Sequence, residues 1–267
     1  MALGSTSPDR RTDYSWRDDP FLAWRIATFA TLVGLAALAW FVTGARTAGM
    51  DMAMGPGALT FFIVTWVVMM AAMMFPSVAP MVATYVSIQR GRRRREMPAA
   101  AGGTALFVAG YLVVWTAAGL VCWAALRVGQ ASQPLATLWQ DHARSVVAVV
   151  LLAAAAYELT PAKYACLSRC RSPLGFVLEH WADGQVGALR MGIVHGAWCV
   201  GCCWALMAAL VALGMMSLGW MALVAVLIAF EKLLPWRRWA TGSVTGALVG
   251  LAALVVLAPS VVPGLMM

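Results

Sequence analysis

Residues 191–207 read MGIVHGAWCVGCCWALM and lie inside a longer apolar stretch, 187–213. About 20 apolar residues suffice for a helix to cross a bilayer, so we predict a spanning helix here. At about 100° per residue, His195, Cys199 and Cys202 fall within an arc of roughly 60° on one side of that helix, and a third cysteine lies beside it. Ionisable side chains are costly inside a membrane, so their presence indicates a functional site.

The composition of the whole chain is typical of a membrane protein. Hydrophobic residues make up 62% of the 267 residues, the mean hydropathy is +0.80, and only 11% of residues are charged. A soluble domain carries about 25% charged residues. We therefore predict an all-α fold, a polytopic transmembrane helical bundle of about seven helices. It forms a single domain over 21–267, after a polar cytoplasmic tail at 1–20. The predicted spans are 22–43, 57–88, 104–127, 145–159, 187–213, 217–234 and 241–258.

The positive charge predicts membrane orientation and not nucleic-acid binding. The formal net charge is +8, from 19 lysines and arginines against 11 acidic residues. If the N-terminus is cytoplasmic, only Arg46, Arg127 and Arg144 lie on the outer side, and the other basic residues lie in cytoplasmic segments. This bias follows the positive-inside rule. Arginine far outnumbers lysine and alanine is abundant, which indicates a bacterial source. We therefore expect a multi-pass protein in the lipid bilayer of the bacterial inner membrane.

Methionines provide a second set of soft ligands. One group lies in the second span at a depth of about 16–18 Å, comparable with about 13–20 Å for the cysteines. Another group lies in the outer loop that precedes this span. Thioethers and thiolates favour Cu(I), so we predict that both groups handle this ion; ordinary packing or lipid contact is the alternative. The two groups are Met69, Met70, Met73 and Met74 in the span, and Met50, Met52 and Met54 in the loop.

A further cysteine pair, Cys166 and Cys170, falls in the largest cytoplasmic connection, 160–187. The two residues are one helical turn apart, and Arg169 and Arg171 would favour their thiolates. We interpret the pair either as an acceptor for a metal ion leaving the membrane or as incidental interfacial cysteines. The isolated Cys122 is predicted to pack as a small hydrophobic residue.

Two acidic residues, Glu158 and Glu231, lie near cytoplasmic helix ends. Snorkelling, or ion pairs with Lys163 and Lys232, accounts for them. The alternative is support of the metal ligands or proton exchange during metal transfer.

Other local signals concern the shape of the helices. Prolines in the second span should kink or break it, because proline lacks the N–H that a helix needs. The segment 174–181 is predicted to form a short interfacial helix. Three glycines in the last span, spaced four residues apart, suit close helix packing. The prolines are Pro76 and Pro80, and the glycines are Gly242, Gly246 and Gly250.

One histidine and three cysteines, Cys203 included, predict a metal site, most simply for copper. Zinc also accepts Cys and His ligands, and haem is a further alternative, although the chain has no CxxCH motif. The first alternative function is a membrane thiol–disulfide oxidoreductase, possible for the pairs Cys199/Cys202 and Cys166/Cys170. The second is a structural or assembly subunit with a fixed metal or haem. No nucleotide-binding motif is present, so transport or delivery of a metal ion would involve a protein partner.

Four blocks of sequence, spread in order over about 170 residues, together resemble a known family. It is a bacterial family of predicted metal-binding integral membrane proteins, formerly classed as a domain of unknown function. The resemblance implies a metal-binding role, with copper handling as the usual suggestion, and it implies no demonstrated reaction. The blocks are W-x₂-MMAAMMFPSVAP from Trp66 to Pro80, YELTPAKYACLSRCRSP from Tyr157 to Pro173, MGIVHGAWCVGCCWALM from Met191 to Met207, and FEKLLP from Phe230 to Pro235.

Overall fold

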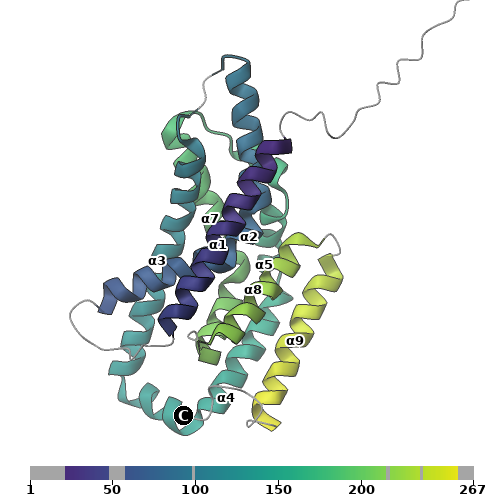
Figure 1. Cartoon of the computed structure of the whole chain (residues 1–267). Helices are drawn as coiled ribbons and strands as arrows, with labels where there is room; N and C mark the ends of the chain where they lie inside the picture. Colours follow the sequence, from purple (N-terminus) through teal and green to yellow (C-terminus); the bar gives the residue numbers. More distant parts are fainter. Residues whose placement is uncertain (1–21, 48–57, 98–99, 215–216, 235–236, 258–267) are drawn as a thin grey trace, which may run out of the picture.

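A computed structural model describes the chain except for residues 1–21, 48–57, 98–99, 215–216, 235–236 and 258–267. All regular structure within the described ranges is α-helical (Figure 1), as predicted from composition. The predicted tail 1–20 and the methionines Met50, Met52 and Met54 lie outside the described residues. The helices are α1 Leu22–Thr47, α2 Ala58–Arg94, α3 Gly103–Ala131, α4 Gln133–Glu158, α5 Pro161–Cys170, α6 Pro173–His180, α7 Gly184–Gly214, α8 Leu218–Leu233 and α9 Arg237–Leu257.

Helix α7 forms the centre of the bundle. It packs against α3, α4, α5 and α8, while α1 and α2 pair on one side and α9 lies along α4 on the other (Figure 1). Because α7 is apolar all round, it can be surrounded by other helices in this way. One side of the stretch 191–207, which includes His195 and the three cysteines, is therefore placed in the interior of the protein.

Four helices, α2, α3, α7 and α9, are long and apolar enough to cross a membrane. A fifth span results if α4 and α5, which bend by 68° at their junction, are counted together. The predicted spans 22–43 and 217–234 correspond to α1 and α8. Helix α8 has 16 residues and a length of about 24 Å, which is shorter than the ~30 Å apolar core of a bilayer. Seven spans and a cytoplasmic N-terminus remain predictions.

Helix α2 is continuous through both of its prolines, so the predicted break does not occur. Pro76 cannot donate a hydrogen bond to the carbonyl oxygen of Ala72, four residues earlier. Trp40 of α1 replaces this donor: its Nε1 donates to the Ala72 oxygen at 3.2 Å. The tryptophan thus satisfies the orphaned carbonyl and attaches α1 to α2. The helix is 37 residues long, and its arginine-rich end extends past its neighbours at the top of Figure 1.

Close contact between α3 and α7 depends on glycine. A Cβ atom at Gly192 would collide with the backbone of Phe107, and one at Gly110 would collide with the backbone of Leu189. Small residues let helix backbones approach in this way, which increases van der Waals contact. The approach brings Tyr111, next to Gly110, against the cysteine-bearing part of α7.

The chain turns sharply between α4 and α5 at Leu159-Thr160-Pro161. Proline is favoured at the first position of a helix, and Thr160 caps α5 by accepting a hydrogen bond from the Lys163 backbone N–H at 3.2 Å. Helix α5 then packs along α7 and is followed by α6, the short helix predicted at 174–181. The segment predicted as a cytoplasmic connection therefore packs against the centre of the bundle.

The three glycines of α9 do not pack against another helix in the described part of the chain. Open space surrounds the Cβ position of Gly242, Gly246 and Gly250, and all three residues are exposed. The expectation of close packing is wrong within this chain, because α9 turns Val244 and Leu248 toward its neighbours.

Candidate metal centre

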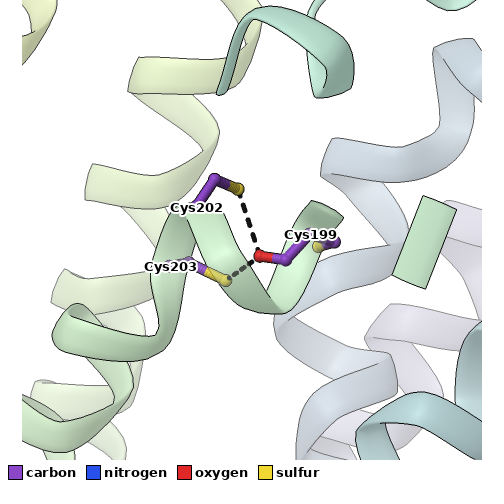
Figure 2. A group of neighbouring side chains, drawn as sticks. All are labelled: Cys199, Cys202 and Cys203. Carbon is purple, nitrogen blue, oxygen red and sulfur yellow. Dashed lines mark hydrogen bonds between the residues drawn. The ribbon is translucent and has the colours of Figure 1, made fainter. Parts of the chain in front are cut away.

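Three cysteines of α7 form a compact buried group. The sulfur atoms of Cys199, Cys202 and Cys203 all lie within 4.8 Å of one another, and each residue is 1% exposed. Figure 2 shows the thiols of Cys202 and Cys203 directed at the carbonyl oxygen of Cys199, to which they donate at 3.1 and 2.9 Å. Spacings of three and four residues on a helix produce this convergence.

Helix α5 brings the second cysteine pair to the same place. The Cys202 thiol lies 3.8 Å from the sulfur of Cys170, the last residue of α5. The Cys166 sulfur faces Gly201, where a Cβ atom would be only 2.8 Å away. The absence of a side chain at Gly201 thus makes room for Cys166. The two cysteine groups that look separate in the sequence form one cluster, which we call the cysteine cluster: Cys166, Cys170, Cys199, Cys202 and Cys203.

Two polar side chains from other helices reach Cys199. Lys232, in the last turn of α8, donates from Nζ to the Cys199 sulfur at 2.9 Å. The hydroxyl of Tyr111 from α3 lies 3.0 Å from the same sulfur. Lys232 also lies 3.5 Å from the hydroxyl of Ser77 on α2, so this one amine links three helices.

Beside the cluster lies a buried ionic group. Lys163 of α5 donates to Glu158 of α4 at 2.7 Å and to Glu231 of α8 at 2.8 Å, and all three side chains are at most 2% exposed. The predicted ion pairing is confirmed for Lys163, which binds both glutamates, whereas the predicted pairing with Lys232 is wrong. Snorkelling does not account for the glutamates, since their side chains are buried. Lys232 pairs with neither glutamate and turns to Cys199.

His195 occupies a different environment, one turn before Cys199. Its ring lies among the rings of Phe107, Tyr111 and Phe176, with centroids 5.1 to 6.0 Å apart. The ring is buried and its Nδ1 has no hydrogen-bond partner. His195 is not among the residues whose ligand atoms lie within 4.8 Å of one another. The role of His195 as a metal ligand stays a prediction. The unpaired Nδ1 is the atom that would bind the ion.

The four predicted methionines of α2 are all buried in the common core. Met73 and Met74 lie one turn before Ser77, and Met70 lies two turns before it, so these three share a side of α2 with Ser77. Ser77 in turn is joined to Cys199 through Lys232. Met69 lies on the adjoining side of the helix. The structure therefore places Met70, Met73 and Met74 on the side of α2 that faces the lysine, beyond the cluster itself.

Sequence reasoning missed two residues of this site, Tyr111 and Lys232. Tyr111 lies well inside an apolar span, whereas tyrosine is common at the membrane interfaces. This position is a weak sequence signal of a functional residue. Lys232 was interpreted as the partner of a glutamate because the two are adjacent in the FEKLLP block. Neighbouring helical residues point about 100° apart, so Glu231 and Lys232 meet different helices.

The donor set fits a soft metal ion. Thiolate sulfurs select Cu(I), Zn(II) and iron–sulfur clusters over hard cations. A buried group of sulfurs from two helices, with no carboxylate turned toward it among the described residues, suits an ion of this class. The carboxylates next to the site are bound by Lys163 and therefore do not compete as ligands.

Comparison with known proteins agrees with this chemistry. A family model described as a copper chaperone, PpoB2, matches residues 63–256, which include the cysteine cluster and every helix from α3 to α8. No curated protein and no solved structure matches the chain. The match covers well over half of the sequence, and the chain therefore belongs to the PpoB2 copper chaperone family.

Proposed function

We propose that this protein binds Cu(I) within the bacterial inner membrane and passes it to a protein partner. The observation that carries the proposal is the cysteine cluster, in which sulfurs from α5 and α7 meet in a buried core. The copper chaperone family supports the choice of ion. Cys199, Cys202, Cys203 and Cys170 would hold the ion as thiolates, with Cys166 and His195 as further ligands during exchange.

The remaining predicted ligands suggest a route for the ion. The outer methionines Met50, Met52 and Met54 would collect Cu(I), since thioethers bind it without competition from protons. The methionines of α2 would carry it toward the cluster. Helices α5 and α6, which lie over the cluster and His195, would be the face where a partner receives the ion. This route rests on seven spans and a cytoplasmic N-terminus.

Metal analysis of anaerobically purified protein tests the proposal. We expect the wild-type chain to retain stoichiometric copper, and the double variant Cys199→Ala, His195→Ala to lose it while its helical circular dichroism is unchanged. Cys122→Ser removes a cysteine outside the cluster and should retain copper like the wild type. Copper retained by the double variant, or zinc found in its place in the wild type, would show that the proposed site or ion is wrong.

A second function, thiol–disulfide exchange, is favoured by one distance. The sulfurs of Cys170 and Cys202 are 3.8 Å apart, so a modest approach would allow a disulfide, with two electrons and two protons passing to a quinone-like acceptor. This pair is an addition to the pairings Cys199/Cys202 and Cys166/Cys170 predicted from the sequence. A redox mobility-shift assay on wild type and Cys170→Ser distinguishes the two functions: reversible oxidation that depends on Cys170 would favour the oxidoreductase.

A further inference from the structure

We propose that Lys232 makes the cysteine cluster selective for monovalent over divalent metal ions. The inference rests on the proposed copper function and assigns the choice of ion to one residue outside the ligand set. Lys232 comes from the last turn of α8, and its Nζ lies 2.9 Å from the Cys199 sulfur.

The amine is held at this position by the surrounding helices. Its Nζ lies 3.5 Å from the Ser77 hydroxyl on α2, and that hydroxyl donates to the Met74 carbonyl oxygen at 2.9 Å. Three helices, α2, α7 and α8, therefore meet around the amine. If a metal ion bound the cluster and displaced Lys232 from Cys199, Ser77 would still keep the amine within a few ångströms of the ion.

The positive charge of Lys232 is not cancelled by a nearby carboxylate in the described part of the chain. The two buried carboxylates of this region, Glu158 and Glu231, are both bound to Lys163. Although Glu231 precedes Lys232 in the sequence, its side chain points to α5. The ammonium group therefore acts on the cluster directly.

The physical reason for selectivity is that Coulomb energy scales with the charge of the bound ion. The Coulomb attraction of negatively charged thiolates is greater for a divalent ion than for a monovalent one, and an all-thiolate cluster by itself also suits zinc. A fixed ammonium repels a divalent ion with twice the energy that it repels a monovalent one, and the effect is large where water is scarce. Lys232 therefore lowers zinc affinity more than Cu(I) affinity.

The test measures the ratio of two affinities on the purified full chain in detergent. Cu(I) and Zn²⁺ affinities are determined separately by chelator competition under anaerobic, reducing conditions. In Lys232→Leu, which carries neither a charge nor a ligand atom for a metal ion, we expect the ratio of Zn²⁺ to Cu(I) affinity to rise roughly tenfold or more, equivalent to about 1.4 kcal/mol. Lys232→Arg keeps the charge and should leave the ratio near that of the wild type.

Lys232→Gln provides a second neutral variant in case the leucine variant fails to fold, and thermal unfolding checks each protein. An unchanged ratio in both folded neutral variants would overturn the role of Lys232 while leaving copper binding intact. A wild-type chain that binds no Cu(I) would instead overturn the proposed function, so the two failures are distinguishable.

Discussion

Cys170 shows at the scale of one residue how the site differs from its appearance in the sequence. It is 32 positions away from Cys202, and their sulfurs lie 3.8 Å apart. A cysteine at the end of a short helix would be an incidental thiol in isolation, but here it adds a sulfur from α5 to the three on α7. Its position supports the proposal that Cys170 is a ligand within the cluster and not an acceptor further along a route.

We predict that Cys170→Ser lowers Cu(I) affinity by roughly tenfold or more, because a hydroxyl is a poor ligand for a soft ion. Chelator competition measures the change. Cys122→Ser, which removes a half-buried thiol of α3 away from the cluster, is the matched control and should leave affinity unchanged. Equal affinities in the two variants would place Cys170 outside the metal site.

At the scale of elements, the contact between α3 and α7 determines whether Tyr111 reaches the cluster. The approach depends on Gly110 and Gly192, each of which lies against the backbone of the other helix. Glycine lowers helix propensity, and this cost is offset here by closer packing. The exposed glycines of α9, in contrast, make no such contact in this chain.

We predict that Gly192→Ala destabilises the protein by about 1–3 kcal/mol, because the new methyl group collides with the backbone of Phe107 and the helices must separate. Gly246→Ala on α9 adds the same methyl group in open space and should be neutral or slightly stabilising. Unfolding of both variants in detergent measures the difference. Similar stabilities would contradict the close packing of α3 on α7.

At the scale of the whole molecule, one buried lysine joins three helices. Lys163 on α5 pairs with Glu158 on α4 and Glu231 on α8, and together they hold the bent α4–α5 unit against the bundle. A buried ion pair is weak evidence for stability, but removing one partner leaves uncompensated charge in the interior.

We predict that Lys163→Met destabilises the fold by about 3–5 kcal/mol, because two buried carboxylates lose the ammonium group that pairs with both of them. The triple variant Lys163→Met, Glu158→Leu, Glu231→Leu removes all three charges and should recover most of that loss. Thermal or denaturant unfolding compares them. A triple variant as unstable as the single variant would show that charge is not the cause.

Membrane orientation is a further property of the whole chain. Seven spans with a cytoplasmic N-terminus place the C-terminus outside. We therefore expect alkaline phosphatase fused after residue 267 to be active, and the same enzyme fused after Arg95 to be inactive. An inactive C-terminal fusion would mean that one of the helices α1, α4 and α8, which do not qualify as full spans by themselves, does not cross.

The sequence by itself determined the helical class and the shared side of Cys199 and Cys202, because both follow from hydrophobic composition and from the 3.6-residue period of a helix. It also indicated the end of α4, because threonine is favoured at a helix N-cap and proline at the first position of a helix, as Thr160 and Pro161 are at the start of α5. These properties are local, so no knowledge of packing is needed to obtain them.

Only the tertiary structure decided which distant side chains meet the cysteines. Cys170 reaches Cys202 because α5 bends by 68° from α4, and Tyr111 reaches Cys199 across 88 positions of sequence because two glycines let α3 approach α7. Lys232 lies at Cys199, whereas its neighbour Glu231 points to Lys163 of another helix. Each contact depends on angles and distances between helices, which the periodicity of a single helix does not specify.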